Sequence, residues 1–483
     1  MLLKNAFIRR MPMSKYDKTY CNPTPLPDYP IGRLCYKDDF ERREDFRESA
    51  DPSVIFDNGV WYLYPSCGMV YWSDDFIHWN HEKMEPYDIG YAPTVVKHKG
   101  RYLLCAMNSE LYVSDSPLGP FKSIGAFKTI GGEDTSFKDP MLFSDDDGRL
   151  YMYSGCGGSI SVTELDSDNP TQLISENILA FAMDTKNHEW ERIGDWNEDP
   201  NYSWVEGSWM YKHGDTYYLT YSAPATHSSS YAMGAYKGKT PLGPWEYMST
   251  SPFLLSPHGL VRGTGHGSLV DGPDGTTWVF YTCLLYYAHG FERRIGYDLI
   301  TFDDDGNIMP REASQNPEWA PGVIKNPTYA QNSAGLIPKT QRKFVMSASS
   351  EAPGREALYA TDDVPFTWWQ PAPDDKEPTL TVLLSKYGTI EINAVRIWWR
   401  DVGFNIKNGV FPGPFGFKVE ARLLDGEWEC VLDKSDNHVD MNIDYFVIES
   451  RRVNEVRLVI TSKPEGIEPG VINFTVFGAR PSF

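Results

Sequence analysis

The sequence lacks the features expected of a membrane protein or of a disulfide-bonded secreted protein. No run of about 18 apolar residues occurs, so we expect no transmembrane helix. The seven cysteines are scattered and form no CxxC pair, which is typical of reduced thiols in the cytoplasm. The opening stretch MLLKNAFIRRMPMSKYDK is too poor in apolar residues and too interrupted by charge for a signal peptide. We therefore expect a cytoplasmic protein.

Basic residues are also scarce. Lys and Arg number 45 against 66 Asp and Glu, which gives a formal net charge of −21. Such an acidic surface repels nucleic acids and anionic membranes. A neutral or soluble partner fits this charge better. The sequence leaves the oligomeric state open.

Aromatic residues, glycine and proline are abundant, whereas no segment of any length has the hydrophobic period of a helix. The 483 residues include 15 Trp, 29 Tyr, 40 Gly and 35 Pro. This composition favours an all-β protein with many tight turns. A chain of this length has room for two or three domains.

A unit of strand, turn and aromatic strand recurs five times before residue 305. Each copy has a short apolar run, a turn rich in Asp, Asn, Lys and Gly, and an alternating aromatic strand, and this order is typical of a β-hairpin. A further strand follows each copy. The copies are ADPSVIFDNGVWYLYPS from Ala50, YAPTVVKHKGRYLLCAM from Tyr91, KDPMLFSDDDGRLYMYSG from Lys138, VEGSWMYKHGDTYYLTYS from Val205 and GHGSLVDGPDGTTWVFYT from Gly265.

The spacing of the copies predicts a five-bladed β-propeller. Their starts are 41, 47, 67 and 60 residues apart, about the length of a four-stranded blade with variable loops. A β-sandwich with regular hairpins is the alternative, but it does not require the second residue of every copy to recur in register.

A change of pattern divides the chain. We predict the propeller, with an N-terminal extension, over residues 1–325 and a linker rich in Asn, Pro, Gly and Ser over 326–343. Residues 344–483 contain further strands, such as TLTVLLS from Thr379 and INAVRIWWR from Ile392, and are predicted to form a β-sandwich.

The second residue of each copy carries the chemistry. We take the apolar strand of each copy to be innermost, so these five side chains should meet in the central funnel; they are Asp51, Ala92, Asp139, Glu206 and His266. Acidic groups crowded in a funnel have their pKa values pushed apart, as a general acid and a general base require. Two carboxyl groups that flank a bond are suited to glycosidic cleavage.

Each of these residues also has a purely structural interpretation. Asp51 and Asp139 precede prolines and could belong to turns, and His266 could be a hydrogen-bonded core histidine. Their shared position in the repeat favours the functional interpretation.

Four blocks together resemble glycoside hydrolase family 43. They are ADPSV at Ala50, KDP at Lys138, EGSW at Glu206 and GTGHGSLV at Gly263, in the family's order and within roughly residues 20–310. The resemblance implies that Asp51 is the general base, that Glu206 is the general acid, and that Asp139 tunes the pKa of the acid and orients it. It further implies that a water attacks the anomeric carbon with inversion.

The same resemblance extends to residues around these blocks. It implies that His266 lies in the axial cavity near a water or a structural calcium ion, which it would contact through water, and that no cofactor is required. It also implies that Arg294 contacts substrate. Any of the aromatic residues beside the motifs, Trp72, Phe137, Trp204 and Trp209, could stack on a sugar ring, and we favour Trp72 and Phe137. Trp209 is expected in the core.

The resemblance implies a substrate class but no single sugar. The expected activity is release of terminal α-L-arabinofuranosyl or β-D-xylosyl residues from plant-derived oligosaccharides, with galactofuranosides or galactans as the alternative within the family. A retaining fructoside hydrolase of the related propeller class and a non-catalytic sugar-binding propeller are further alternatives. The blocks SASSEAPGREALYATDDVPFTWWQP and INFTVFGA are similar to discoidin-like sandwiches, and we expect this second domain to brace the propeller.

Overall fold

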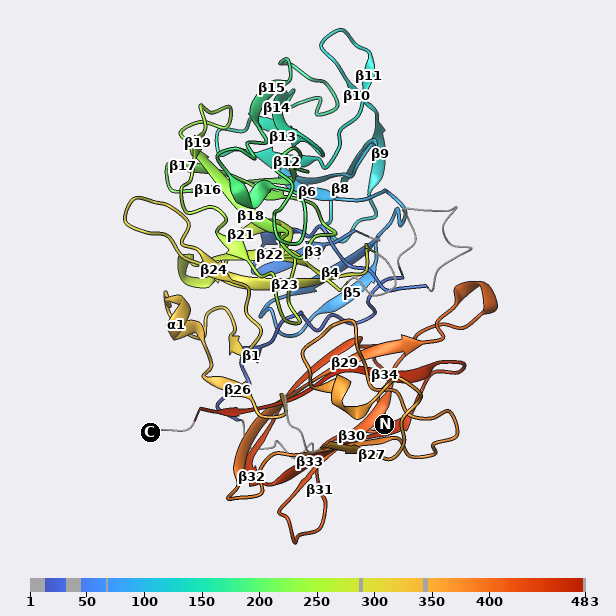
Figure 1. The fold of residues 1–483 in the computed structure, drawn as a ribbon. Coiled ribbons are helices and arrows are strands. Elements are labelled where there is room, and N and C mark those ends of the chain that lie inside the picture. The colour runs from blue at the N-terminus through green and yellow to red at the C-terminus, as the bar shows by residue number, and fades with distance from the viewer. Residues whose placement is uncertain (1–13, 32–44, 67, 286–289, 342–345, 481–483) are drawn as a thin grey trace, which may run out of the picture.

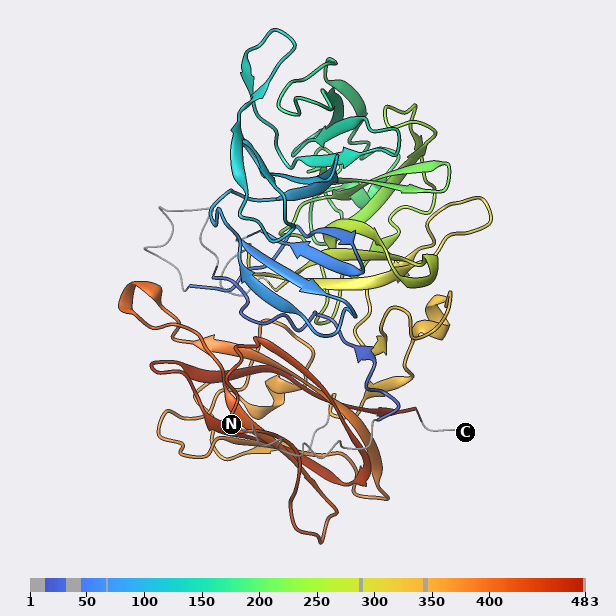
Figure 2. The same ribbon diagram turned by 180° about the vertical axis from the view of Figure 1, so that it is seen from behind.

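The computed structural model describes residues 14–31, 45–66, 68–285, 290–341 and 346–480. Two β-rich parts are visible, one coloured blue to yellow and the other orange to red (Figures 1 and 2). No helix among the described residues has the length and hydrophobicity that a membrane crossing requires. The N-terminal residues used for the signal-peptide prediction lie largely outside the described residues, as do Cys35 and Cys67. The other five cysteines are free thiols.

The first part contains five antiparallel sheets in chain order. Their strands are β2 (Ser53–Asp57), β3 (Val60–Tyr64), β4 (Met69–Ser73) and β5 (Asn80–Lys83) in blade 1; β6 (Thr94–His98), β7 (Arg101–Cys105), β8 (Leu111–Ser114) and β9 (Lys122–Gly125) in blade 2; β12 (Met141–Ser144), β13 (Leu150–Ser154), β14 (Ser159–Leu165) and β15 (Ile178–Ala182) in blade 3; β16 (Glu206–His213), β17 (Thr216–Ala223) and β18 (Ala232–Gly238) in blade 4; and β21 (Gly265–Asp271), β22 (Thr277–Leu284) and β23 (Arg293–Ile300) in blade 5.

Short strands extend or connect these sheets. Blade 4 also holds β19 (Glu246–Tyr247), β20 (Leu254–Leu255) and β24 (Arg311–Glu312), and a small hairpin consists of β10 (Phe127–Lys128) and β11 (Asp134–Thr135).

The innermost strands form a closed ring. In turn, β2 contacts β6, β6 contacts β12, β12 contacts β16, β16 contacts β21, and β21 returns to β2. The predicted five-bladed propeller and its innermost strands are therefore confirmed.

The N-terminal segment runs along the outer strand of blade 5. The Thr24 amide donates to the Ile295 carbonyl at 2.7 Å, and the Asn22 side chain bonds both the carbonyl (2.9 Å) and the amide (3.1 Å) of Tyr297. Close by, β1 (Thr19–Tyr20) pairs with β25 (Glu318–Trp319). These contacts tie the start of the chain to the last blade.

Hairpin turns of the repeat follow from residue type. Asn58 and Gly59 have φ of 51° and 84°, and Lys99 and Gly100 have φ of 47° and 82°. Two successive residues with positive φ are typical of the type I′ turn, whose twist matches that of the flanking strands.

The second part is a two-sheet sandwich. One sheet has the order β26 (Leu336–Pro338), β34 (Glu468–Ala479), β29 (Ile390–Val402) and β32 (Ile443–Val453), and the other has the order β27 (Met346–Ala348), β28 (Thr379–Leu383), β33 (Glu455–Ser462), β30 (Gly416–Arg422) and β31 (Glu429–Lys434). Side chains such as Ile397 and Trp399 from the first sheet share a buried core with Val419 and Leu458 from the second. The predicted β-sandwich is confirmed, whereas its discoidin-like character stays a prediction.

In the part of the chain that the structure describes, helical structure is limited to single turns. These are α1 (Tyr329–Asn332) and the 3-10 turns η1 (Glu189–Glu191), η2 (Pro273–Gly275), η3 (Ala357–Ala360) and η4 (Ile406–Asn408). The segment predicted as a linker contains α1 and also β26, which pairs with the last strand of the sandwich. The proposed domain boundaries stay a prediction.

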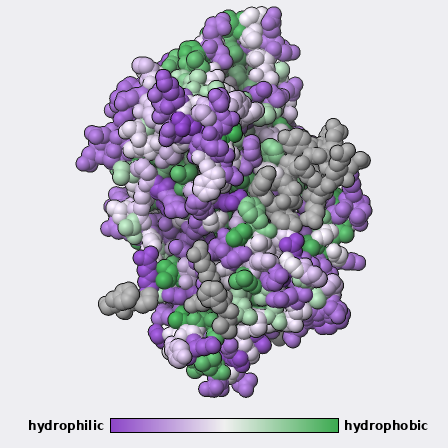
Figure 3. All heavy atoms as spheres, viewed as in Figure 1, coloured by the Kyte–Doolittle hydropathy of each residue, from purple (hydrophilic) through white to green (hydrophobic). Residues whose placement is uncertain are grey.

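One face of the molecule is largely polar. On the face shown in Figure 3, hydrophilic residues predominate and hydrophobic residues occur in small separate groups.

Candidate active site

The second residue of each repeat lies at the inner edge of its blade, in an unusual backbone conformation. Asp51, Ala92, Asp139 and His266 have φ of 49°, 49°, 45° and 43°. In blade 4 the positive φ falls one residue later, at Gly207, with φ of 60°. Residues other than glycine rarely adopt this left-handed region, and such strain is concentrated at functional sites.

Two features require glycine at position 207: its positive φ and the close approach of the His266 side chain. A Cβ built on it would lie 2.8 Å from Cγ of His266. Blade 4 thus brings its backbone against the side chain of blade 5, and this packing places Glu206 beside His266.

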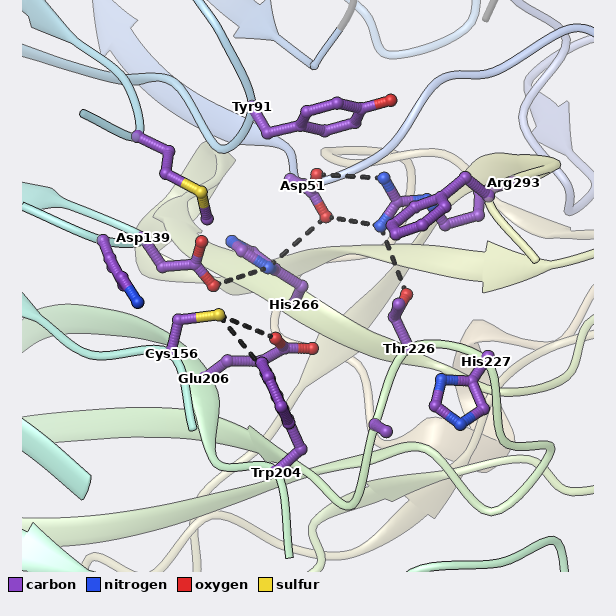
Figure 4. Close-up of a pocket in the computed structure, with 14 residues that line it drawn as sticks. Asp51, Tyr91, Asp139, Cys156, Trp204, Glu206, Thr226, His227, His266 and Arg293 are labelled. Atoms are coloured by element: carbon purple, nitrogen blue, oxygen red, sulfur yellow. Dashed lines mark hydrogen bonds and ion pairs between the residues drawn. The ribbon is translucent and has the colours of Figure 1, made fainter. Parts of the chain in front are cut away.

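These inner residues line a pocket of about 430 Å³, within the range of small-molecule sites. The pocket is lined by Asp51, Tyr91, Met107, Lys138, Asp139, Cys156, Trp204, Glu206, Ala225, Thr226, His227, His266, Phe291 and Arg293. Figure 4 shows Asp51 and Arg293 on one side of His266, and Glu206 with Cys156 and Trp204 on the other.

Asp51 is buried in a cationic environment. Its two carboxylate oxygens lie 3.0 and 3.2 Å from the guanidinium of Arg293, and the Ser66 hydroxyl donates to it at 2.7 Å. Nδ1 of His266 is 3.3 Å from Oδ1 of Asp51, the oxygen that Ser66 does not bond. Burial acts to raise the pKa of Asp51, but Arg293 and His266 outweigh it and leave the pKa below its usual value. Asp51 is therefore ionised at neutral pH.

Arg293 is held by a second buried carboxylate. Its guanidinium is 2.7 Å from Glu48, and Glu48 in turn accepts a hydrogen bond from the Tyr91 hydroxyl at 2.8 Å. Arg293 also donates to the Thr226 hydroxyl at 3.2 Å. The forked guanidinium is thus fixed between two carboxylates, a geometry that lysine could not reproduce.

Among the described residues, the side chains that donate hydrogen bonds to Glu206 are uncharged. The Tyr231 hydroxyl donates to one oxygen at 2.7 Å, and the Cys156 thiol donates to the other at 3.5 Å. Burial raises the pKa of Glu206, and the charge of Asp51 adds to this effect, although His266 and Tyr231 oppose it. Burial also raises the pKa of the Cys156 thiol, so it remains a donor.

Asp139 lies close enough to both other carboxyl groups for their charges to affect its pKa. Burial raises its pKa to about 7, with contributions from the charges of Glu206 and Asp51, while His266 lowers it. Its carboxylate is 3.8 Å from Nδ1 of His266. Because these groups interact strongly, their protonation belongs to the cluster as a whole.

The structure therefore brings together four of the predicted site residues, Asp51, Asp139, Glu206 and His266. The arrangement pairs a carboxylate that stays ionised with a carboxyl group that tends to keep its proton. This is the chemical requirement for concerted base and acid catalysis.

Arg294, predicted to contact substrate, does not line the pocket, whereas its neighbour Arg293 does. Arg294 is fully buried and directed away from the pocket, donating to the Asn442 side chain at 2.9 Å and to the Arg47 carbonyl at 2.8 Å. Consecutive residues of a strand point to opposite faces, so it is Arg293 that reaches Asp51.

The two aromatic residues predicted to stack on sugar do not line the pocket. Trp72 lies on β4, the third strand of its blade, and pairs with Asn80 of the outer strand. Phe137 is buried in the core between blades, with its ring 5.0 Å from that of Phe127. Trp204 lines the pocket instead, and Trp209 is in the core as expected.

The sequence analysis did not predict several pocket residues, although they share one position of the repeat. Met107, Cys156 and Ala225 each lie two residues beyond the second strand of their blade. In blade 1 the same position is Ser66, which bonds Asp51. A second register position of the repeat therefore also faces the site.

Residues next to the pocket contact the sandwich. Arg47, beside Glu48, lies 2.7 Å from both Asp401 and Asp440. Glu292, beside Arg293, lies 3.1 Å from Arg400. Together with the bond from Arg294 to Asn442, these contacts fix the backbone on both sides of the Arg293–Glu48 pair.

The surroundings of His266 fit calcium poorly. Calcium takes six to eight oxygen ligands. Among the described residues, one group of His, Cys, Asp and Glu side chains has its ligand atoms within 4.8 Å of one another. It consists of Asp139, Glu206 and Cys156, so one of its three ligand atoms is a sulfur. The nearest carboxylate to His266, that of Asp51, is already paired with Arg293.

Comparison with known proteins gives a family and several relatives. The model of the family described as glycosyl hydrolases family 43 matches residues 48–308. A β-D-galactofuranosidase of Aspergillus niger is 26% identical over 199 residues, covering 40% of this chain and 52% of that protein. A β-xylosidase of Xylanibacter ruminicola is 30% identical over 219 residues, covering 41% and 63%. A xylosidase/arabinosidase of Humicola insolens is 26% identical over 329 residues, covering 54% and 96%.

The chain thus spans about half to two thirds of the length of the first two relatives. Among solved structures, a thermostable family-43 glycoside hydrolase is 28% identical, with 57% of this chain and 97% of that chain covered and a TM-score of 0.49. A family-43 protein from Bacillus licheniformis is 15% identical, with 96% and 100% covered and a TM-score of 0.49.

Proposed function

Because the chain belongs to glycosyl hydrolases family 43, we propose that it hydrolyses glycosidic bonds and releases terminal pentose residues, α-L-arabinofuranosyl or β-D-xylosyl, from oligosaccharides. The observation that carries the proposal is the pairing of Asp51, ionised beside Arg293, with Glu206, whose pKa is raised by burial. Both carboxyl groups open into the same pocket.

In the proposed reaction Asp51 is the base and Glu206 the acid. Asp51 accepts a proton from a water as the water oxygen attacks the anomeric carbon. Glu206 donates its proton to the glycosidic oxygen as the bond from that oxygen to the anomeric carbon breaks. One sugar leaves with inverted configuration, and the remaining oligosaccharide leaves with a new hydroxyl group.

Asp139 and His266 support this exchange without reacting themselves. Asp139 titrates near neutral pH, with a pKa of about 7, and its charge influences whether Glu206 keeps its proton. His266, 3.3 Å from Asp51, helps to hold the base ionised. The reaction requires water and the chain's own side chains, and no step passes through a calcium ion.

The names of the relatives support pentose release. The Xylanibacter relative is a β-xylosidase and the Humicola relative a xylosidase/arabinosidase. The Aspergillus relative is a β-D-galactofuranosidase, so galactofuranoside cleavage is the second candidate. A cytoplasmic location remains part of the proposal, and it would favour short oligosaccharides as substrates.

The test is hydrolysis of nitrophenyl glycosides by the wild type and by Glu206→Ala. We expect the wild type to cleave the α-L-arabinofuranoside or the β-D-xyloside, with β-D-galactofuranoside and β-D-fructofuranoside as comparisons. Proton NMR of the first product formed should show the anomer opposite to that of the substrate. Product of unchanged configuration would favour the retaining mechanism, and no cleavage of any substrate would favour a sugar-binding propeller.

A further inference from the structure

Three aromatic side chains from one segment are exposed beside the pocket. They are Trp196, Tyr202 and Trp204, of which Trp196 is 78% exposed and Trp204 37% exposed. The rings of Tyr202 and Trp204 are 6.1 Å apart, edge to face, and Trp204 itself lines the pocket. Through Trp204, the ring of Tyr202 is therefore joined to the candidate active site.

The segment that carries these rings is held in a defined conformation. The Ile193 amide bonds the Tyr202 carbonyl at 3.2 Å, and the Thr185 hydroxyl bonds the Pro200 carbonyl at 2.6 Å. The Asn197 side chain donates to the Trp190 carbonyl at 2.8 Å. An exposed tryptophan on a fixed segment leaves apolar area in water in the absence of a ligand, which is typical of a binding surface.

The same segment is bonded to another wall of the pocket. The Asp195 carboxylate accepts hydrogen bonds from the amide and hydroxyl of Ser229, at 2.7 and 3.0 Å. Ser229 lies two residues after His227, which lines the pocket. This bond ties the residue before Trp196 to the segment that carries His227, and the ring of Trp196 is 6.0 Å from that of His258.

The position of Trp204 relative to Glu206 identifies which part of a substrate would meet this surface. The Trp204 indole N–H donates to the Cys156 sulfur at 3.2 Å, and the Cys156 thiol donates to Glu206. A general acid protonates the oxygen that leaves with the aglycone. The aromatic surface thus lies on the leaving-group side.

The charge of the segment restricts the ligand further. Residues 193–204 include Asp195, Glu198 and Asp199 but no Lys or Arg. Such a surface would repel a chain of uronic acids, whereas the faces of aromatic rings suit the C–H faces of neutral sugars.

We infer that Trp196, Tyr202 and Trp204 form a binding surface for a chain of neutral sugars on the aglycone side of the cleaved bond. The inference rests on the proposed function, because the leaving-group side is defined by Glu206 as the acid. It predicts that oligosaccharides several sugars long are better substrates than disaccharides or aryl glycosides.

The test compares the wild type with Trp196→Ala and Tyr202→Ala on substrates of different length. On a pentose-terminated hexasaccharide, each variant should lose about 5-fold in kcat/KM, mainly through KM. On the nitrophenyl glycoside of the same sugar, Trp196→Ala should leave kcat/KM unchanged, because Trp196 does not line the pocket. Tyr202→Ala, which removes a ring packed on Trp204, should lose less on this substrate than on the hexasaccharide. The matched control is Tyr387→Ala, which removes a ring that is 93% exposed on the sandwich and should affect neither substrate.

Equal losses on both substrates, or no loss on the hexasaccharide, would overturn the inference. Binding of xylohexaose and arabinohexaose to Glu206→Gln, measured by calorimetry, separates this inference from the proposed function. Binding that weakens on adding Trp196→Ala supports the surface even if the wild type cleaves no tested glycoside. Binding that is unaffected, or absent for both sugars, contradicts it.

Discussion

The two sides of the pocket differ in the partners that they offer a buried carboxyl group. On one side Asp51 is surrounded by charge, with Arg293 between it and Glu48, and with His266 nearby. On the other side Glu206 also lies beside His266, but the side chains that donate hydrogen bonds to it among the described residues are the neutral Tyr231 and Cys156. Burial alone would raise the pKa of both groups. The difference shows that the partners decide which carboxyl group loses its proton.

The two sides also differ in what supports them. The charged side is joined through Arg47, Glu292 and Arg294 to residues of the sandwich. The neutral side is built within the propeller, from blades 3 and 4 and the aromatic segment between them. The sandwich is therefore in a position to influence the base more than the acid.

Removing the proposed base should have the largest effect. Asp51→Asn keeps the size of the side chain but cannot accept the proton of water, and we expect kcat to fall about 10³- to 10⁴-fold on every substrate. The measurement is steady-state hydrolysis of the nitrophenyl glycosides. A loss below tenfold would assign the base to another residue.

Changing the charge beside the base should shift the acidic limb of the pH profile. The rate falls at low pH as the base is protonated, and Arg293 lowers the pKa of Asp51. Arg293→Gln should therefore raise that pKa and move the acidic limb upward by about one pH unit or more. The alkaline limb should move less, because the Arg293 guanidinium bonds none of the oxygens of Glu206.

Arg293→Lys is a second variant in case the glutamine variant does not fold. It keeps the positive charge but loses the planar guanidinium that bonds both carboxylates. It should give a smaller shift of the acidic limb in the same direction. An acidic limb that stays in place in a folded variant would contradict the role given to Arg293.

On the neutral side the effect should be smaller and appear at the other limb. The Tyr231 hydrogen bond lowers the pKa of Glu206, so Tyr231→Phe should raise it and keep the acid protonated to higher pH. The alkaline limb should move upward, and kcat at the optimum should fall about 3- to 10-fold. An acidic limb that moved instead would reverse the assignment of the two sides.

The smallest effect is expected from the sandwich. Asn442→Ala removes the acceptor of Arg294, next to Arg293, and should cost about 1 kcal/mol of stability with a small upward shift of the acidic limb. Asn473→Ala is the matched control, because Asn473 accepts from Arg396, which bonds Asn22 and Gln315 away from the pocket. Equal pH profiles for the two variants would leave the sandwich a purely structural role.

The repeat made most of the propeller and half of the site predictable. Five copies with hairpin turns defined the blades, and their second position identified Asp51, Asp139, Glu206 and His266. The sequence did not show that Arg293, rather than Arg294, faces the pocket. All eight residues of β23 are buried, so no alternation of polar and apolar residues shows which face of the strand is axial.

Other features depended on contacts between distant segments. Glu48 and Arg293 are 245 residues apart in the chain, and neither has a partner recognisable from local pattern. Phe137 is two residues from Asp139 but packs between blades. In the sandwich, charged residues interrupt the apolar pattern of β31 and β32, as in ECVLDK and IDYFVIESRRV.

The central claim, that Asp51 is the base and Glu206 the acid, is tested most directly by the effect of leaving-group acidity. Hydrolysis of a dinitrophenyl and a methyl glycoside of the preferred sugar would be measured for the wild type, Asp51→Ala and Glu206→Ala. A good leaving group needs no protonation, so Glu206→Ala should retain most activity on the dinitrophenyl substrate and lose at least about 100-fold on the methyl glycoside. Asp51→Ala should lose activity on both. Similar losses for Glu206→Ala on the two substrates would show that Glu206 is not the acid.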